Sequence, residues 1–256
     1  MKEFEILTIN TPVVKATMKN EGIALVKGMP EVYHKEFDIT EFIGEQLAGI
    51  RGVRSAHYIP ICFGEYKKCL ASAKYGFDRG NIRVGSPSFK KIGNKYICSS
   101  SMIYRVGGNY FENLLDACPS LENAVQLSDE HFEMEALDVY MGQHDRRSNI
   151  YYEVYPNGEI HLAPMFDYEN SMFDALKESV VYESDFNSYR KIDDYRRMID
   201  RYPQFGEMLS SYVDVDLVKQ IEEMARTRKF DLSGFDLEPY KRFDDESHKK
   251  LELILK

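Results

Sequence analysis

The N-terminal part of the chain alternates short β-rich runs with polar breaks. This alternation predicts antiparallel strands, with the Asn20-Glu21-Gly22 stretch as the turn before the last of them. The expected strands are residues 4–9, 13–18 and 23–26. Lys27 directly follows the apolar residues of the third strand. It is either an exposed strand-end lysine or a cation directed at an anionic ligand.

The next segment has a helical pattern. Asp38 is a candidate N-cap, and Glu41 stands three residues later, as in a capping box. The apolar stripe comprises Phe42, Ile43, Leu47 and Ile50. Glu41 and Glu45 lie one turn apart on one helix face, so either carboxylate is a candidate partner for Lys27. Glu41 also has the simpler role of a capping residue.

The pattern after this helix changes from strand to loop and back. Residues 53–63 read as a strand interrupted by Pro60, and proline is confined to edge strands because it has no backbone N–H. Residues 76–91 are rich in glycine, serine and basic residues without a period, which is typical of a loop. Residues 96–104 are β-like again, so we expect a boundary between two lobes at residues 98–110.

The second half of the chain begins with apolar residues at helical spacing. The expected helices are residues 111–117, 120–126 and 128–142, followed near the C-terminus by 189–202, 205–212, 216–227 and 244–255. Pro119 and Ser128 are the expected starts of the second and third helix. His131 and Glu135 lie one turn apart, as metal ligands can, but without an HExxH motif a solvated helix face is favoured. The Lys249-Lys250 pair is also typical of a solvated face.

Residues 141–172 contain the strongest local signal. The Asn157-Gly158 pair favours a two-residue hairpin turn, and strand-like runs flank it at residues 150–155 and 159–163. The sequence therefore predicts a β-hairpin in the middle of this stretch.

Polar side chains gather at the open end of this hairpin. A turn centred on its two predicted residues places Asn149 opposite Phe166 and beside Asp167. An amide oxygen and a carboxylate are suitable ligands for a small hard cation such as magnesium. Asp145 precedes this pair and is a candidate to orient or deprotonate an attacking hydroxyl. The alternative is that these residues only cap strand ends and turns, as short polar side chains often do.

Composition narrows the class of protein. The 256 residues are 43% hydrophobic and 29% charged, which is typical of a globular protein. The net charge of −9 argues against nonspecific nucleic-acid binding as the main task. The sequence shows no long apolar run and no secretory signal, so we expect a cytoplasmic protein without a membrane partner. The widely spaced cysteines, Cys62, Cys69, Cys98 and Cys118, predict reduced thiols.

The order of these parts is the order that a kinase fold needs, and three stretches carry a family resemblance. They are ALVKG at residues 24–28, EFIGEQLAGIRGVRSAHY at 41–58 and GQHDRRSNIYYEVYPNGEIHLAPMFDYENS at 142–171. At these residues the sequence resembles the HipA-like kinases, relatives of the lipid-kinase branch of the protein-kinase superfamily. The resemblance implies an α+β, two-lobed, protein-kinase-like fold. A small β-rich N-lobe with one main helix, residues 1–104, would bind nucleotide, and a larger, mostly helical C-lobe, residues 105–256, would contain the catalytic hairpin.

The resemblance also implies roles for individual residues. Lys27 would contact ATP with Glu41 as its partner, and Asp145 would be the catalytic aspartate. The implied magnesium ligands are Asn149 and Asp167. The segment 11–17, which contains Lys15, occupies the position of the phosphate loop but lacks the glycines of GxGxxG.

The catalytic loop departs from the family pattern in two ways. Three residues separate Asp145 from Asn149 where the superfamily usually has four, so either the loop is tighter or His144 takes the place of the aspartate. Arg147 stands where a histidine is common, and it would contact phosphate, an acidic substrate or a local carboxylate.

We therefore expect an ATP- and magnesium-dependent phosphotransferase, a kinase that acts on a serine or threonine hydroxyl of a protein. One alternative is a pseudokinase, an interaction module that binds nucleotide without transfer. A second alternative is a nucleotidyl transferase that transfers AMP on the same fold.

Overall fold

The computed structural model describes residues 4–10, 13–18, 22–27, 40–63, 66–74, 90–92, 95–99, 114–143, 146, 149–166, 168, 192–228, 232 and 236–256. Side chains are described within residues 40–56 and from residue 114 onwards, and the strands in between and before are described by their backbone. Among these residues no helix is both long enough and apolar enough to cross a bilayer.

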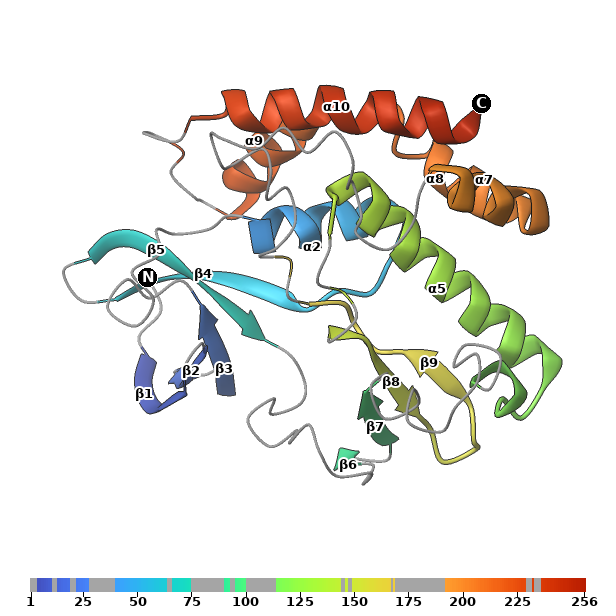
Figure 1. Ribbon diagram of the computed structural model, residues 1–256. Helices are drawn as coiled ribbons and strands as arrows, with labels where there is room; N and C mark the ends of the chain where they lie inside the picture. Colours follow the sequence, from blue (N-terminus) through green and yellow to red (C-terminus); the bar gives the residue numbers. More distant parts are fainter. Residues whose placement is uncertain are drawn as a thin grey trace.

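An antiparallel sheet with the strand order β1-β2-β3-β5-β4 forms the N-terminal part of the molecule (Figure 1). Its strands are β1 (Phe4–Asn10), β2 (Val13–Met18), β3 (Gly22–Lys27), β4 (His57–Phe63) and β5 (Tyr66–Lys74). The first three are rich in Ile, Val and Thr, which favour extended backbone, and they confirm the predicted strands. The β4 strand contains Pro60 and lies at a sheet edge, where the missing N–H is tolerated, also as expected.

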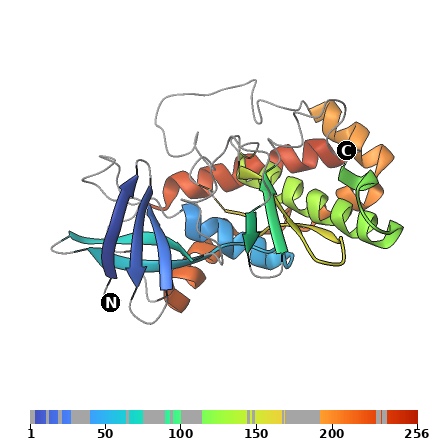
Figure 2. The same ribbon diagram turned by 90° about the horizontal axis from the view of Figure 1, so that it is seen from below.

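Helix α2 (Thr40–Ile50) connects β3 to β4. The predicted apolar stripe is buried apart from Ile50, which is 40% exposed. Both views place α2 between the N-terminal sheet at one end of the molecule and three helices at the other, which are α5 (Leu121–Met141), α7 (Ile192–Arg201) and α8 (Pro203–Ser210) (Figure 1, Figure 2). Gln46 donates from Nε2 to Oε1 of Gln220 at 3.3 Å, so α2 also contacts helix α9 (Leu217–Arg228). This helix therefore joins the sheet to the helical part of the protein.

A second antiparallel sheet has the strand order β6-β7-β8-β9. Its strands are β6 (Lys90–Ile92), β7 (Lys95–Ser99), β8 (Tyr151–Val154) and β9 (Ile160–Leu162). The β6 strand replaces the end of the loop predicted over residues 76–91, and the rest of that loop lies outside the described residues. The β7 strand pairs with β8, for example Tyr96 with Val154, which joins the segment before residue 100 to the C-terminal hairpin.

The hairpin β8–β9 forms, but its turn differs from the predicted one. Tyr155 pairs with Glu159 through an N–H to oxygen bond of 2.9 Å, so the loop is Pro156-Asn157-Gly158. Gly158 has φ +89° and donates its N–H to the oxygen of Tyr155 at 2.9 Å. Proline suits the first central position of a type I turn because its φ is fixed, and glycine suits the left-handed position that follows. The two-residue turn was therefore wrong because it left Pro156 out.

Helix α5 (Leu121–Met141) replaces the two helices predicted between residues 120 and 142. It begins at Ser120, whose side chain accepts a hydrogen bond from the N–H of Asn123 at 3.1 Å. No glycine or proline interrupts the helix, so Ser128 lies in its interior instead of starting a new one. The helix ends at Gly142, which adopts the left-handed conformation with φ 61°.

His131 of α5 does not lie on a solvated face, so that expectation was wrong. Its ring is buried against β8, and Nε2 lies 2.9 Å from the hydroxyl of Tyr152. Burial lowers the pKa of His131 to about 3, because the charged imidazolium would lose its water. The described residues contain no cluster of His, Cys, Asp and Glu that could hold a metal ion. His131 is therefore a neutral core residue.

The C-terminal helices are α7 (Ile192–Arg201), α8 (Pro203–Ser210), α9 (Leu217–Arg228) and α10 (Glu238–Leu255), as the apolar spacing predicted. Together with α2, α5 and the hairpin, they enclose a core rich in aromatic side chains. Lys250 of α10 is a second correction, because it is buried rather than solvated. Its Nζ lies 3.4 Å from the oxygen of Val139 and 6.0 Å from the ring centroid of Tyr195. Burial lowers the pKa of Lys250 to about 8.

Candidate functional site

The structure describes some of the predicted site residues and not others. Glu41 and Asn149 are described with their side chains. Lys15 lies on β2, and Lys27 is the last residue of β3, where its backbone pairs with Ala71 of β5. Asp145 and Asp167 lie outside the described residues, as do His144 and Arg147. Residues that flank them show how the site is built.

Glu41 connects α2 to the segment of Asp167. Its side chain is buried, and Oε2 accepts a hydrogen bond from the backbone N–H of Tyr168 at 2.9 Å. Tyr168 directly follows Asp167 in the chain. The first turn of α2 therefore holds the backbone at one side of the predicted metal ligand.

Tyr168 packs against α2 more closely than any side chain at position 44 would allow. A Cβ atom on Gly44 would lie 2.2 Å from Cγ of the Tyr168 ring. The hydroxyl of Tyr168 lies 2.9 Å from Oγ of Ser55, and burial raises the pKa of this phenol. Gly44 thus lets the helix and the ring approach each other, and the contact with Ser55 ties the ring to the segment before β4.

Arg146 holds the other side of Asp167. Its Nη1 donates to the carbonyl oxygen of Phe166 at 2.7 Å. Its Nε and Nη2 donate to the carboxylate of Asp138 in α5, at 2.9 Å and 3.0 Å for the shortest contacts. The guanidinium carbon also lies 5.2 Å from the centroid of the Tyr168 ring. The backbone carbonyl before Asp167 and the backbone N–H after it therefore both have buried partners.

Asn149 is buried, and its N–H donates to the oxygen of Arg146 at 2.8 Å, which closes a tight turn. The hairpin register is shifted by one residue from the predicted one, so Asn149 and Phe166 are not a cross-strand pair. Ala163 still pairs with β8, whereas Met165 donates its N–H to the oxygen of Arg54 at 2.8 Å. The segment that leads to Asp167 therefore leaves the hairpin and runs beside residues 54–56, which directly precede β4.

Sequence reasoning missed the residues that hold this segment. Asp138 gave one signal, because it stands among Leu137, Val139 and Tyr140, which are apolar residues near the end of a helix. A charge in such a run is buried and needs a partner. Gly44 gave a second signal, because glycine inside a helix lowers the stability of the helix. Such a glycine can mark a place where another element packs closely against the helix.

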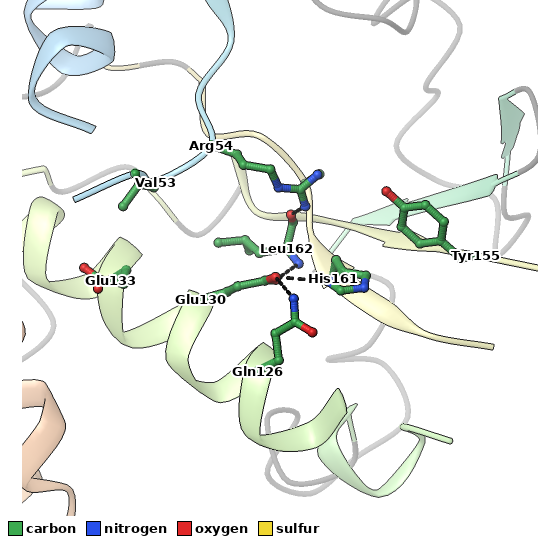
Figure 3. Close-up of a pocket in the computed structure, with 10 residues that line it drawn as sticks. Val53, Arg54, Gln126, Glu130, Glu133, Tyr155, His161 and Leu162 are labelled. Carbon is green, nitrogen blue, oxygen red and sulfur yellow. Dashed lines mark hydrogen bonds and ion pairs between the residues drawn. The ribbon is translucent and has the colours of Figure 1, made fainter. Parts of the chain in front are cut away.

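A separate cavity of about 350 Å³ lies between α5, the hairpin and the turn after α2 (Figure 3). Its lining residues are Gly52, Val53, Arg54, Gln126, Glu130, Glu133, Tyr155, His161, Leu162 and Ala163. None of the predicted site residues is among them. Its charged groups already pair within the protein, because Arg54 donates to Glu153 at 2.9 Å and Arg51 donates to Glu133 at 2.7 Å. The lining therefore does not indicate the charge of a ligand.

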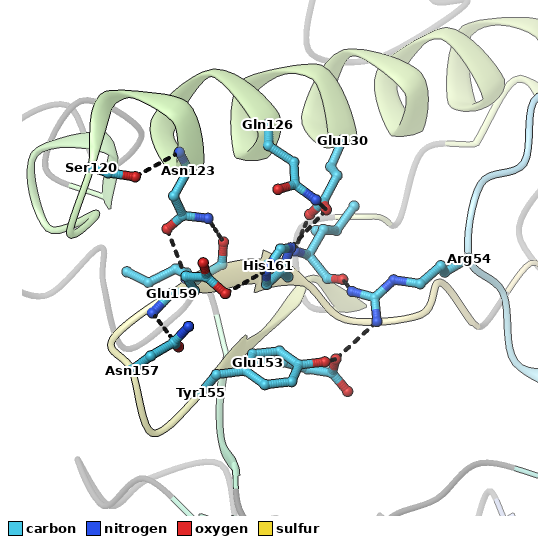
Figure 4. Close-up of polar contacts among 12 residues, drawn as sticks. Arg54, Ser120, Asn123, Gln126, Glu130, Glu153, Tyr155, Asn157, Glu159 and His161 are labelled. Atoms are coloured by element: carbon cyan, nitrogen blue, oxygen red, sulfur yellow. Dashed lines mark hydrogen bonds and ion pairs between the residues drawn. The ribbon is translucent and has the colours of Figure 1, made fainter.

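Polar contacts beside this cavity attach the hairpin to α5 (Figure 4). The side-chain amide of Asn123 donates to the oxygen of Ile160 at 2.9 Å and accepts from its N–H at 3.0 Å. Glu130 accepts from the N–H of Leu162 at 2.6 Å, and its other oxygen lies 3.0 Å from Nδ1 of His161. These side chains satisfy backbone groups of β9 that would otherwise be unpaired at a sheet edge. The contacts thus fix the hairpin that leads to the candidate site.

Comparisons with known proteins identify the fold. No protein-family model and no curated protein matches the sequence. A chain from the Shewanella oneidensis MR-1 toxin–antitoxin complex of HipA, HipB and operator DNA is 15% identical with a TM-score of 0.55, over 99% of this chain and 63% of that one. The Helicobacter pylori proinflammatory kinase CtkA is 13% identical with a TM-score of 0.51, over 98% of this chain and 94% of that one.

The chain thus spans less than two thirds of the length of the Shewanella chain that it resembles. At these identities the likeness concerns the fold. It agrees with the family resemblance carried by residues 24–28, 41–58 and 142–171. The chain has the fold of the HipA-like kinases.

Proposed function

We propose that the protein is an ATP- and magnesium-dependent phosphotransferase that acts on a serine or threonine hydroxyl of a protein. The observation that carries this proposal is the contact between Glu41 and the N–H of Tyr168, within a kinase-like fold. This contact brings the helix whose glutamate would orient the ATP-contacting lysine to the segment whose aspartate would bind the metal. Phosphoryl transfer depends mainly on such positioning and on charge neutralisation.

The proposal includes a two-lobed arrangement with nucleotide bound between the lobes. The sequence placed the boundary near residue 104. Strand pairing favours an earlier one, because β6 and β7 belong to the sheet of the C-terminal hairpin and not to the N-terminal sheet. We therefore place the N-lobe at β1 to β5 with α2, and the C-lobe from β6 onwards.

The nucleotide would be held by residues of both lobes. Lys27 would neutralise the ATP phosphates, and Lys15 on β2 would approach them from the neighbouring strand. Glu41 would orient Lys27, since a carboxylate accepts several hydrogen bonds and the N–H of Tyr168 uses one of these sites. Glu45 remains the alternative partner for Lys27.

The predicted ligands suit magnesium, because the amide of Asn149 and the carboxylate of Asp167 offer oxygen donors to a hard cation. Asn149 is buried in a turn closed by its own N–H, and the backbone around Asp167 is held on both sides. The bound metal would neutralise charge on the phosphates. Asp145 would accept the hydrogen bond of the acceptor hydroxyl and orient its oxygen for in-line attack.

A pseudokinase is the second candidate, and the short loop between Asp145 and Asn149 favours it. Of its described residues, Asn149 donates its N–H to the oxygen of Arg146. Such a protein would bind ATP with magnesium but would not transfer phosphate.

The test is to incubate the purified protein with magnesium and ATP labelled on the γ-phosphate, alone and with cell extract. The proposal expects labelled protein and loss of labelling in the Asp145→Asn variant. Intact mass distinguishes the chemistry, because an added phosphate is far lighter than an added AMP. Magnesium-dependent ATP binding without turnover, unchanged by Asp145→Asn, would show a pseudokinase instead. If the protein shows no ATP binding and no turnover, nucleotide chemistry is refuted altogether.

A further inference from the structure

We propose that Arg146 is a positioning residue that sets the distance between the two segments carrying the metal ligands. The inference rests on the proposed function and adds a residue that neither the sequence motif nor the fold assigns. Arg146 contacts the Asn149 turn through its backbone and the Asp167 segment through its side chain. One residue therefore connects both parts of the metal site.

The side chain is held rigidly at its base. Nε donates to both carboxylate oxygens of Asp138, at 3.2 Å and 2.9 Å, and Nη2 donates to Oδ1 at 3.0 Å. This geometry leaves Nη1 directed at the oxygen of Phe166, 2.7 Å away. The planar guanidinium has a fixed fork of donors, so fixing one side of it fixes the other.

Because the Arg146–Asp138 pair is buried, its main contribution is the geometry that it fixes and not net stability. Arg146 is 7% exposed and Asp138 is 4% exposed. A buried ion pair loses much of its attraction to desolvation, so an apolar pair would serve stability as well. What an apolar pair would lack is the bond to Phe166. That bond ties the last turns of α5 to the residue before Asp167.

A lysine at position 146 separates these functions. It keeps the positive charge beside Asp138, but its ammonium is a single point without the planar fork, so it does not hold Asp138 and Phe166 in the same way. The charge of the site stays the same while the link to the metal segment weakens. Residues that orient metal ligands typically change metal affinity by about 10- to 100-fold when they are altered.

The experiment measures the magnesium concentration that gives half-maximal ATP binding, by titrating magnesium chloride against the 256-residue protein and a fluorescent ATP analogue. Arg146→Lys is expected to raise this concentration by about tenfold or more. Asp138→Asn, which loosens the base of the fork, is expected to raise it in the same direction. ATP binding without magnesium should stay the same in both variants.

Tyr140→Phe provides the control for general loss of stability. Tyr140 lies in the same helix as Asp138, and its hydroxyl donates a buried hydrogen bond of 2.6 Å to Asp244 of α10, so the substitution removes a contact that does not involve Arg146. This variant is expected to lower Tm while leaving the magnesium requirement unchanged. A positioning role predicts that the two effects separate, whereas a merely structural role predicts that the magnesium requirement follows Tm in every variant.

The outcomes distinguish this inference from the proposed function. If the wild type binds ATP with magnesium but the variants at positions 146 and 138 need no more magnesium, the positioning role is wrong and the function stands. If the wild type shows no magnesium-dependent binding, the proposed function fails and the inference fails with it. If Arg146→Lys does not fold, Asp138→Asn decides.

Discussion

The carboxylate of Glu41 accepts a hydrogen bond from the backbone N–H of Tyr168, 2.9 Å away and buried. This contact joins a helix near the start of the chain to the residue after Asp167. The fold uses a charged group here for a bond that any acceptor could make. The charge is therefore the part of Glu41 that a lysine partner would need.

Two substitutions separate the bond from the charge. Glu41→Gln keeps an oxygen that accepts from Tyr168, so Tm should change little while ATP affinity falls. Glu41→Ala leaves the buried N–H of Tyr168 without this partner, and we expect a further loss of about 1–3 kcal/mol in the free energy of unfolding. Chemical denaturation and ATP titration measure the two effects. Equal ATP affinity in wild type and Glu41→Gln would show that the charge of Glu41 does not contribute to ATP binding.

The two predicted aspartates should respond differently to truncation. Asp167→Ala removes a metal ligand, so magnesium-dependent ATP binding should be lost. Asp145→Ala removes a group that acts on the acceptor, so ATP binding should persist while transfer stops. Calorimetric titration with ATP and magnesium makes the comparison. An equal loss of ATP affinity in both variants would contradict the assigned roles.

Gly44 should tolerate no side chain. Gly44→Ala places a methyl group 2.2 Å from the Tyr168 ring, and overpacking of this kind destabilises by about 1–3 kcal/mol. Gly49 lies on the same helix, and a Cβ there meets nothing within 4 Å. Gly49→Ala should therefore stabilise the helix by about 0.5–1 kcal/mol. Urea unfolding of both variants tests whether position 44 is a true contact.

Local patterns predicted much of this fold. Strands β1 to β3, helix α2 and the four C-terminal helices follow from spacing that a single segment carries. The hairpin was also predicted, but its register was off by one because Pro156 changed the turn. This error of one residue has a large effect, because it changes every cross-strand partner in the hairpin.

Contacts between distant segments were beyond the sequence patterns. Arg146 forms an ion pair with Asp138 at the end of α5, and no local pattern indicates that these two residues meet. His131 and Lys250 were expected in solvent, and neighbouring elements cover both. Helical spacing identifies residues on a common face but not the element that covers this face. Each of the two buried groups has a pKa shift whose effect on stability is testable.

His131 should make the protein less stable in mild acid. Its pKa is lowered to about 3, so the folded state binds fewer protons than the unfolded state, whose histidine titrates near its ordinary value of 6.5. Stability is therefore fully present above about pH 6.5 and falls as the pH drops towards 3, by at most about 1.4 kcal/mol per pH unit from this group. His131→Gln does not titrate and should show a flatter profile in urea unfolding at pH 7.5, 6 and 5. An identical slope in both proteins would contradict the burial of a neutral imidazole.

Lys250 should be a destabilising residue at neutral pH. Burial lowers its pKa from 10.5 to about 8, so below pH 8 folding places a charged ammonium beside Tyr195 and the oxygen of Val139. Lys250→Met keeps an unbranched apolar side chain and should raise the free energy of unfolding by about 1–3 kcal/mol at pH 7. The neighbouring Lys249 is exposed, so Lys249→Met should change stability little.

The pH dependence distinguishes this effect of Lys250 from a simple gain in packing. Between about pH 8 and 10.5 the unfolded lysine keeps its proton while the folded one loses it, so the wild type gains stability as the pH rises. The advantage of Lys250→Met should therefore shrink over this range. Urea unfolding at pH 7, 8.5 and 10 measures the difference between the two proteins. A constant difference in the free energy of unfolding would mean that the methionine acts through packing alone. It would also mean that the buried charge of the Lys250 ammonium does not destabilise the wild type.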